Sequence, residues 1–525
     1  MPASSLKVAR FSELEDGRPL RVKVEKENVL LIRDGDAVHA YAADCPHAGA
    51  PLEEGAVCHG HIVCPWHKGI FALATGEVLD PPPLMALDRY CVTIDGDNVM
   101  VAPEKPPAHG ASASAGRNDA RVFAIIGAGA AGAAACAGLR RYGFSGRIVL
   151  IGKEPQPPYD RTSLSKFVLS GEMKPAAVPS LLPPDFIANE RIEWMKATVS
   201  RLDADNRRIY FGDGRELIYD AALLAPGSTP VIPDMPGCDL GNVYTLRSLA
   251  DARSLVEAVR DRRRVVILGS SFIGLESAGA LRKRNIDVTV VSTDEVPFSA
   301  QFGDRIGTMF RRLHEDNGVV FRLGAEVAGL AGESAVREVV LASGERIAAD
   351  VVLLGTAVKP ATNFIDGILL QKDGGIAVNA GMRVVPSLYA AGDVASFPLY
   401  DDQPPVRIEH WRVAQQHALI AARNMCGESE HYASVPFFWT HHYGKTFEYL
   451  GHASQWDEIV TDGDLERHDF LALFVKDGKV AAALACQRQR QTARLIGFLR
   501  TGLSVEQALQ IANGNDAGIK AEFSA

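Results

Sequence analysis

The first hundred residues alternate apolar and polar positions in short runs that are separated by Gly, Asp and Pro. Three such runs are RVKVE from Arg21, VLLI from Val29 and VTIDGDNV from Val92. Alternation with a period of two is the pattern of a half-buried β-strand, and the Gly and Asp clusters mark turns. The pattern predicts a small antiparallel all-β domain over residues 1–102.

Residues 103–120 interrupt this pattern, because they are rich in Pro, Ala, Ser and Gly and offer almost nothing to bury. Such a composition is typical of a linker. A flexible linker of this kind would keep the first domain at roughly millimolar effective concentration near the rest of the chain.

Beyond residue 120, continuous apolar runs alternate with helical stretches, which is the α/β pattern. Two segments, beginning at Arg121 and Arg264, share one order: an apolar strand, a Gly-rich turn, a helix and a second strand. From residue 433 the pattern changes to longer strands and a final helix. The chain is therefore predicted to be multidomain, with two Rossmann-like nucleotide-binding units and a C-terminal α+β domain.

Composition and charge narrow the class of protein. The chain has 525 residues and a net charge of −9, so no general attraction to nucleic acid or anionic lipid is implied. No segment approaches the roughly 18 apolar residues of a membrane span, and the N-terminus lacks the apolar core of a signal peptide. We expect a soluble cytoplasmic protein. Its eight cysteines do not resemble a disulfide scaffold.

Two short motifs in the β domain each contain one cysteine and one histidine. Cys45 and His47 form the first motif, and Cys64 and His67 form the second. Two such pairs on two loops can hold a two-iron cluster, with thiolates on one iron and neutral imidazoles on the other. A tetrahedral zinc site is the alternative, because Cys₂His₂ also suits zinc. Zinc fingers usually pair Cys with Cys and His with His around a helix, so the spacing favours the cluster.

The wider string CPWHKGIF from Cys64, followed by a proline run from Pro81, resembles the Rieske family. High-potential members of that family carry an additional cysteine in each loop, joined as a disulfide. Here the corresponding positions are Gly49 or Ala50 and Trp66. The resemblance implies a ferredoxin-type two-iron two-sulfur cluster. Its metal ligands would be Cys45, His47, Cys64 and His67.

The first Gly-rich turn has the context of a dinucleotide site. Gly127, Gly129 and Gly132 follow an apolar strand and open an Ala-rich helix. Glycines at this spacing allow a tight turn, close approach of a pyrophosphate and close helix packing, with the phosphate at the helix N-terminus. Glu154 ends the next strand, where an acidic residue can bind the adenosine ribose.

Three further segments resemble class-I ferredoxin reductases such as putidaredoxin reductase. They are PYDRTSLSK from Pro158, LLAPG from Leu223 and LYAAGD from Leu388. In that family the first segment contacts the flavin and the aspartate of the last holds the ribityl chain. The resemblance implies FAD. The residues it implicates are Arg161, Ser165, Lys166, Ala225, Gly227, Gly392 and Asp393.

Thiol–disulfide flavoenzymes are the neighbouring alternative. They place a redox-active cysteine pair where this chain has residues 159–166, and no cysteine occurs there. Cys136, within the helix of the flavin unit, is interpreted as packing. Disulfide reductase chemistry is therefore not expected.

The second unit reads GSSFIGLE from Gly269, which makes Gly269 and Gly274 candidate contacts of a nicotinamide dinucleotide. Ser271 stands where the family usually has a glycine, so we expect slight crowding of the pyrophosphate. The second strand is followed by Asp294 and Glu295 without an adjacent Arg. An acidic residue there favours NAD, so NADH with Asp294 on its ribose is expected, and NADPH stays open.

By the same resemblance, Glu276 pairs with Lys166 beside the flavin, which fits the need of a buried carboxylate for a partner. Trp411 is a candidate aromatic wall for the flavin or nicotinamide, with core packing as the alternative. Lys166, Glu276 and Trp411 are the candidate catalytic residues. Glu409 and His410 are expected to contact the cofactor, whereas His441 and His442 are expected to be unrelated to catalysis.

Over nearly its whole length, the chain resembles the apoptosis-inducing-factor-like branch, in which a Rieske domain precedes the reductase. We read the domains as FAD-binding (residues 121–245 and 373–432), NAD(P)-binding (246–372) and a C-terminal interface domain (433–525). The resemblance implies an oxidoreductase that passes electrons from NADH through FAD to its own cluster, and then to an acceptor such as an oxygenase or haem protein. The alternative is a redox-sensing interaction protein whose reduced flavin changes conformation or oligomeric state; a homodimer is compatible with either.

Overall fold

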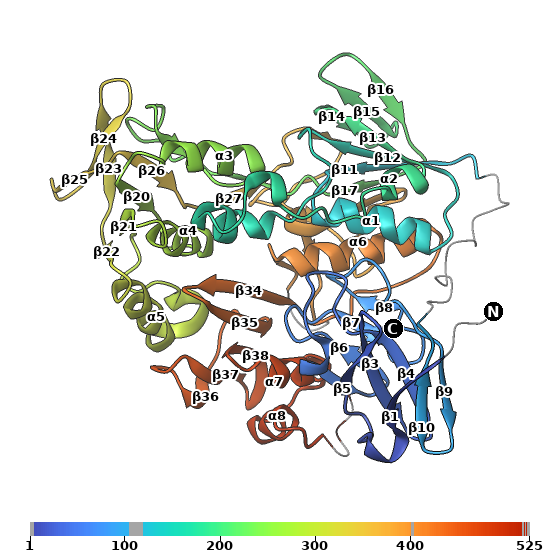
Figure 1. The fold of residues 1–525 in the computed structure, drawn as a ribbon. Helices are drawn as coiled ribbons and strands as arrows, with labels where there is room; N and C mark the ends of the chain where they lie inside the picture. The colour runs from blue at the N-terminus through green and yellow to red at the C-terminus, as the bar shows by residue number, and fades with distance from the viewer. Residues whose placement is uncertain (1–4, 104–118, 401–403, 517–518, 520, 522–525) are drawn as a thin grey trace.

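The computed structural model describes residues 5–103, 119–400, 404–516, 519 and 521. It contains an N-terminal β domain, two α/β domains and a C-terminal sheet with helices (Figure 1), which confirms the predicted fold class. Of the predicted linker 103–120, residues 104–118 lie outside this description. Among the described helices, none is long and apolar enough to cross a membrane.

The N-terminal domain consists of three antiparallel sheets. Strand β10 lies between β1 and β9, β3 lies between β2 and β4, and β5 to β8 follow one another as a meander. The strand bounds are β1 Leu6–Arg10, β2 Leu20–Val24, β3 Glu27–Asp34, β4 Ala37–Ala42, β5 Ala56–Cys58, β6 His61–Val63, β7 Ile70–Ala72, β8 Val78–Asp80, β9 Val92–Asp95 and β10 Asn98–Val101.

The first α/β domain is built on a six-stranded sheet of order β13-β12-β11-β17-β31-β30. Its central strand β11, Val122–Ile126, is apolar throughout, as a parallel strand covered on both faces requires. Helices α1, Ala130–Arg141, and α6, Trp411–Met425, pack against each other (Figure 1). They approach closely because α1 is rich in Ala and Gly: a Cβ at Gly138 would lie 3.0 Å from Leu419 of α6.

The remaining elements of this domain are short. Their bounds are β12 Arg147–Gly152, α2 Phe186–Asn189, β13 Ile192–Lys196, β14 Val199–Asp203, β15 Arg208–Phe211, β16 Glu216–Ile218, β17 Ala221–Leu224, β18 Ser228–Pro230, β27 Val358–Pro360, β28 Ile365–Asp366, β29 Ile376–Ala377, β30 Arg383–Val385, β31 Leu388–Ala390, β32 Ala395–Phe397 and β33 Val406–Arg407.

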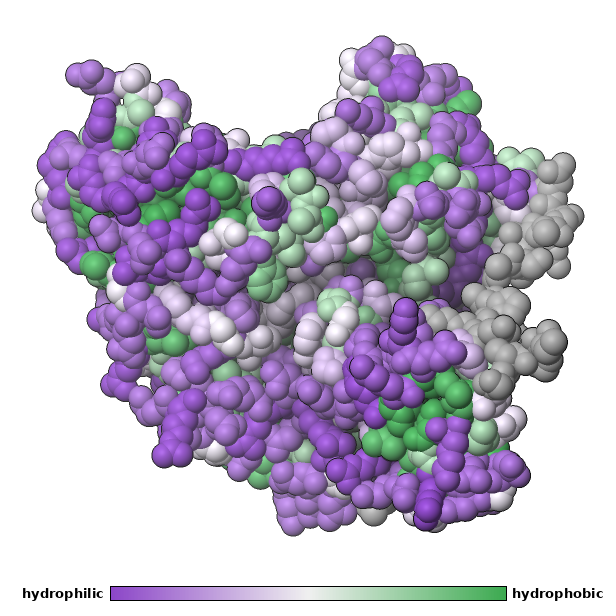
Figure 2. All heavy atoms as spheres, viewed as in Figure 1, coloured by the Kyte–Doolittle hydropathy of each residue, from purple (hydrophilic) through white to green (hydrophobic). Residues whose placement is uncertain are grey.

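The second α/β domain has a five-stranded parallel sheet of order β19-β26-β20-β21-β22 and a small antiparallel sheet, β23-β24-β25. Figure 2 shows that the face in view is hollowed between the two α/β domains. The bounds are β19 Val243–Tyr244, α3 Leu249–Ala258, β20 Arg264–Leu268, α4 Phe272–Arg282, β21 Asp287–Val291, α5 Ser299–Glu315, β22 Val319–Arg322, β23 Val327–Gly332, β24 Val336–Leu341, β25 Arg346–Ala348 and β26 Val351–Leu354.

The C-terminal domain is an antiparallel sheet of order β34-β35-β38-β37-β36 with two helices. Both faces of its inner strands are buried. Along β37, Phe470 and Phe474 join a core shared with the NAD(P)-binding domain, whereas Leu471 and Leu473 join a core shared with the β domain. The bounds are β34 Phe437–His442, β35 Lys445–Gly451, β36 Glu458–Asp464, β37 Asp469–Lys476, β38 Lys479–Cys486, α7 Gln489–Leu495 and α8 Val505–Ala512.

A buried guanidinium joins the β domain to the rest of the chain. Arg412, in the first turn of α6, is 0% exposed. It donates to the carbonyls of Pro81 (2.7 Å), Lys68 (3.0 Å) and Val435 (3.0 Å), and to the Asp80 carboxylate (2.8 Å). One side chain therefore ties three domains together.

A second buried ion pair lies on the same interface. Lys68 Nζ is 2.8 Å from Glu448 Oε1, and Thr492 donates to the other oxygen at 2.6 Å. Burial raises the pKa of Glu448 and the charge of Lys68 opposes that rise. We call Asp80, Arg412, Lys68 and Glu448 the docking seam.

The Arg412→Met variant should unfold at a lower urea concentration, with a loss of about 3–5 kcal/mol, because it leaves the Asp80 carboxylate buried without its cation. The matched control is Arg423→Met on the same helix, whose half-exposed pair with Glu430 should contribute under about 1 kcal/mol. Equal losses in the two variants would contradict the role of the docking seam.

Candidate functional site

The four candidate metal ligands converge at one end of the β domain. Cys45 and His47 lie in the loop after β4, and Cys64 and His67 lie in the loop after β6. Both cysteines are buried, and the Nδ1 atoms of the two histidines are 3.1 Å apart. The fold thus collects the two sulfurs on one side and the two imidazoles on the other.

The pKa shifts of these cysteine and histidine side chains are compatible with metal binding. A hydrogen bond with Cys64, and then burial, raises the pKa of the Cys45 thiol. Burial, and then the charges of His47, Lys68 and Lys166, hold the pKa of His67 well below its usual range. A neutral imidazole is the form that ligates a metal.

The donor set of one Cys pair and one His pair matches that of a two-iron cluster. Among the described residues, no group of three or more His, Cys, Asp or Glu side chains is placed to hold a single ion. A structural zinc ion requires four ligands around one point. Each iron of a Rieske cluster takes only two protein ligands, which is the arrangement of one Cys pair and one His pair found here.

The first Gly-rich turn forms a cradle at the N-terminus of α1. A Cβ at Gly127, whose φ is +116°, would lie 1.9 Å from the Ala225 carbonyl, and one at Gly132 would lie 2.0 Å from the Gly127 carbonyl. Gly129 differs, because a Cβ there would meet nothing within 4 Å. Side chains are therefore excluded at Gly127 and Gly132, whereas open space remains at Gly129, where a pyrophosphate fits.

Two buried polar atoms at the start of α6 lack a protein partner within the described part of the chain. His410 Nδ1 and Trp411 Nε1 are buried and have no hydrogen-bond partner among the described residues. Buried polar atoms are normally paired, so these two fit a polar ligand such as a flavin ring. Burial lowers the pKa of His410 to about 3, so its ring is neutral there.

Glu154, the candidate ribose contact, and Asp393, the candidate ribityl contact, each accept hydrogen bonds from one arginine and one hydroxyl group. Glu154 accepts hydrogen bonds from Tyr159 (2.7 Å) and from Arg161. Asp393 accepts from Ser228 (2.7 Å) and Arg247 (2.8 Å), and Gly392 precedes it with φ +76°.

Two other predicted contacts lie around these carboxylates. Gly227, with φ +71°, sits beside the Arg247 guanidinium, and a Cβ there would lie 3.0 Å from Nη2. Glu409 pairs with Arg407, which also donates to the Asp393 carbonyl at 3.0 Å. No sequence pattern marks Arg247, whose side chain lies beside Gly227 and Asp393. Its carbonyl accepts from Arg161 at 3.0 Å, so that Arg247 contacts all three predicted flavin segments.

The predicted Lys166–Glu276 pair is present and buried. Lys166 Nζ lies 2.9 Å from Glu276 Oε2, and Ser165 donates to the same oxygen at 2.5 Å. Lys166 belongs to a π-helical turn, Leu164–Val168, a form that often marks functional positions. Glu276 has a further partner that the sequence did not suggest: Thr440 donates to Oε1 at 2.7 Å.

The second Gly-rich turn resembles the first in its close contacts. Cβ atoms at Gly269 and Gly274 would lie 2.5 Å from the carbonyls of Gly355 and Gly269 respectively. Ser271, which we expected to crowd a pyrophosphate, is the N-cap of α4 and turns its hydroxyl inward. Its Oγ accepts from Gly274 N (3.1 Å) and donates to the Gly355 carbonyl (2.7 Å). Asp294 follows β21, is exposed, and accepts from Ser270 at 2.7 Å.

The cluster ligands and the flavin segments face each other. The ring of His67 lies against Trp439, with centroids 4.1 Å apart. The charge of Lys166 acts on His67, and that of Asp160 acts on His47. Residues 158–166, predicted to contact the flavin, therefore lie within electrostatic range of both imidazoles.

Family models match three parts of the chain. The model described as pyridine nucleotide-disulphide oxidoreductase matches residues 122–418, that of the Rieske [2Fe-2S] domain matches residues 4–91, and that of the reductase C-terminal domain matches residues 437–516.

Curated relatives and solved structures agree with these matches. Apoptosis-inducing factor 3 of Mus musculus is 35% identical over 95% of this chain and 84% of its own length. The ferredoxin–NAD(+) reductase component of the biphenyl dioxygenase system of Paraburkholderia xenovorans is 35% identical over 74% of this chain and 96% of its own. A ferredoxin reductase from Rhodopseudomonas palustris aligns with a TM-score of 0.71 at 26% identity, covering 76% of this chain and all of that one.

The Gly129→Val variant should keep the stability of the FAD-free protein within about 1 kcal/mol, since the side chain enters open space. Its FAD dissociation constant should rise at least about tenfold, because that space is where the pyrophosphate would lie. Urea unfolding of the stripped protein and FAD fluorescence titration measure the two effects. Unchanged FAD affinity would place the pyrophosphate elsewhere.

Proposed function

Because this chain belongs to the pyridine nucleotide-disulphide oxidoreductase family and carries a Rieske domain, we propose that it delivers electrons from NADH through FAD to its own cluster, and from there to an external protein. It is a ferredoxin-reductase-type NAD(P)H flavoprotein, and the predicted cofactors FAD, NAD(P)H and a [2Fe-2S] cluster are confirmed. The single observation that carries the proposal is the packing of His67 against Trp439 at 4.1 Å, within the reductase.

FAD supplies the conversion between a hydride and single electrons. The protein's task is to hold the nicotinamide against the flavin at about 3–3.5 Å, since hydride transfer requires no acid or base residue. Lys166 and Glu276 would fix the charge beside the ring, and the turn at Gly127 would hold the pyrophosphate. The docking seam would keep the cluster close, so that transfer is intramolecular.

Asp294 supports NADH rather than NADPH. Its carboxylate is exposed at the end of β21 and is oriented by Ser270 and Ser292 at 2.7 and 3.1 Å. A carboxylate there accepts hydrogen bonds from the ribose hydroxyls of NAD and repels the additional phosphate of NADP.

Anaerobic mixing with NADH should bleach the flavin and then reduce the cluster, at a rate that does not depend on protein concentration. Trp439→Leu should slow cluster reduction at least about tenfold, equivalent to about 1.4 kcal/mol of barrier, without changing flavin bleaching. Visible absorbance and low-temperature electron paramagnetic resonance follow the two cofactors. The matched control is Trp456→Leu, in the same domain but packed on Phe474.

A wild-type protein whose flavin bleaches while the cluster stays oxidised would contradict the proposal. A stable reduced flavin accompanied by a change in oligomeric state would instead favour the redox-sensing alternative.

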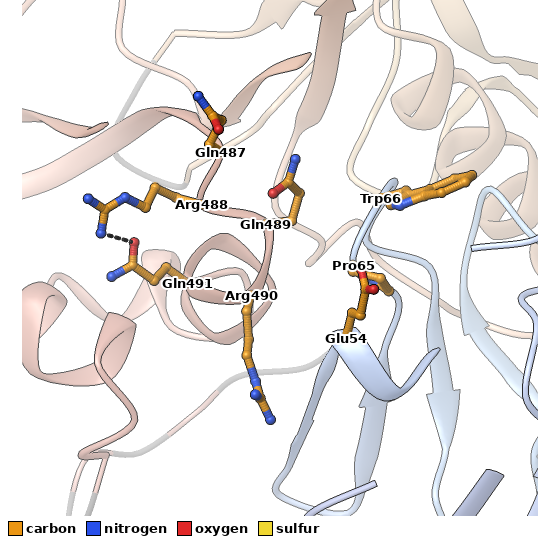
Figure 3. Close-up of a pocket in the computed structure, with 8 residues that line it drawn as sticks. All are labelled: Glu54, Pro65, Trp66, Gln487, Arg488, Gln489, Arg490 and Gln491. Carbon is orange, nitrogen blue, oxygen red and sulfur yellow. Dashed lines mark hydrogen bonds between the residues drawn. The ribbon is translucent and has the colours of Figure 1, made fainter. Parts of the chain in front are cut away.

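The external acceptor would dock beside Trp66. A pocket of about 360 Å³ opens between the loop of Pro65 and Trp66 and residues 487–491 (Figure 3). Trp66 is 41% exposed and precedes the candidate ligand His67. Arg490 is exposed and forms no ion pair with any described residue, although the chain carries a net charge of −9. The pocket is also lined by Glu54, on the wall opposite Arg490, so the charge of the lining is mixed. The guanidinium of Arg490 suits an acidic group on the acceptor.

Arg490→Glu should raise the KM for an acidic ferredoxin, used as the probe acceptor, by about tenfold, which corresponds to about 1.4 kcal/mol of interaction. Flavin reduction by NADH should not change. The control Arg253→Glu makes the same charge change at an exposed position of α3 and should leave the KM within about twofold, as expected for long-range screened charge. A similar rise in both variants would exclude this docking surface.

A further inference from the structure

A row of hydrogen-bonded side chains leads away from the Lys166–Glu276 pair. Thr440, on β34, donates to Glu276 Oε1 at 2.7 Å. The same hydroxyl lies 2.9 Å from Nε2 of His442, on the same strand. Thr440 and His442 are each 1% exposed.

The row continues to the surface through α5. His442 Nδ1 lies 3.2 Å from Nε2 of His314, and His314 Nδ1 lies 3.0 Å from the Tyr443 hydroxyl. His314 is fully buried, whereas Tyr443 is partly exposed. The row therefore joins the candidate flavin site to solvent across the contact between α5 and β34 (Figure 1).

Both nitrogens of both imidazoles are used within the row, which fixes its polarity. An ionised Glu276 can only accept, so Thr440 donates to it and must accept from His442 Nε2–H. His442 Nδ1 then accepts from His314 Nε2–H, and His314 Nδ1 accepts from Tyr443. Every hydrogen bond points toward Glu276, and both histidines are Nε2–H tautomers.

The surroundings keep the row neutral. His442 is flanked by the rings of Phe310 and Phe447, at 5.4 and 6.0 Å between centroids. Burial, and then the charges of His441 and Lys166, lower the pKa of His442 to about 3. Burial and His442 likewise hold the pKa of His314 well below its usual range. Neutral imidazoles can pass a proton on without retaining it.

Tyr443, at the outer end of the row, lies within electrostatic range of the charged Arg282. Burial raises the pKa of Tyr443, and the charge of Arg282 opposes that rise. A free tyrosinate is therefore disfavoured, so Tyr443 must take a proton from water as it gives one to His314.

The proposed function gives such a path a use. A hydride delivered to a neutral flavin ring would add negative charge beside Glu276. A proton taken up by this carboxylate would offset that charge, and it would leave again when the electrons pass to the cluster. Glu276 is the buried carboxylate that the row connects to solvent.

We propose that Thr440, His442, His314 and Tyr443 form a proton relay between Glu276 and solvent. In the inward step, Tyr443 takes a proton from water, each member passes one on, and Thr440 protonates Glu276 Oε1. The row then points outward, and when the electrons leave, the reverse step returns that proton to water, so the row moves no net proton over one cycle. This inference rests on the proposed flavin site, and the residues beyond Glu276 are positioned to act through it.

The first test measures the tautomers. In the full-length, flavin-loaded oxidised protein labelled with ¹⁵N-histidine, His442 and His314 should both be neutral Nε2–H tautomers at pH 7. Tyr443→Phe should perturb His314 Nδ1 and leave His441 unchanged. An Nδ1–H tautomer at either His442 or His314 would overturn the polarity derived above, and with it the relay.

The second test measures proton movement. The flavin is photoreduced without NADH, and a pH-indicator dye records proton uptake beside flavin bleaching. In wild type the two should coincide. In Tyr443→Phe and His442→Gln, uptake should lag bleaching at least about tenfold, because each change removes a link of the row.

Matched controls are Tyr449→Phe, whose hydroxyl accepts from Ala453 N, and His441→Gln, whose ring meets Thr446 outside the row. Both should behave as wild type. Synchronous uptake in Tyr443→Phe would overturn the relay. Because the flavin is reduced by light, a failure of electron transfer to the cluster cannot produce or hide this result.

Discussion

The fully buried guanidinium of Arg412 is the interaction on which the arrangement of the domains depends. It is permanently charged, and its donors are directed at groups from the β domain and the C-terminal domain while its own helix belongs to the flavin domain. Separating these domains would leave a buried charge without partners. Because Trp411 precedes Arg412, and Lys68 follows His67, the same contact fixes the distance between the flavin segment and the cluster loop.

Strand β34 separates the two proposed routes. Alternate side chains of a strand point to opposite faces. Phe437 and Trp439 belong to the core shared with the β domain, and Trp439 meets His67 there. Thr440 and His442 point the other way, toward Glu276 and His314. Adjacent residues of one strand would thus take part in electron transfer on one face of the sheet and in proton transfer on the other.

The sequence was sufficient to predict the cofactor motifs, but not the contacts between residues that lie far apart in the chain. The spacing of Cys45–His47 and Cys64–His67 and the two Gly-rich turns identify cofactors, because each motif lies in a single loop. The docking seam joins residues more than three hundred positions apart, such as Asp80 and Arg412, and no local pattern marks such a pair. The sequence likewise suggests no role for His442, because its partner His314 lies on another domain. The inward direction of the Ser271 hydroxyl could not be predicted either, because its bond to the Gly355 carbonyl joins residues far apart in the sequence.

The C-terminal sheet has no solvent face along β37, and this has a consequence for how the gene could change. A truncation that removed the β domain would take Ala56, Val63 and Ile70 out of the core that also contains Leu471 and Leu473. It would uncover the apolar side chains of the C-terminal domain that these three residues cover, and such a surface promotes aggregation. We therefore expect loss of the β domain to require compensating polar substitutions on the C-terminal domain.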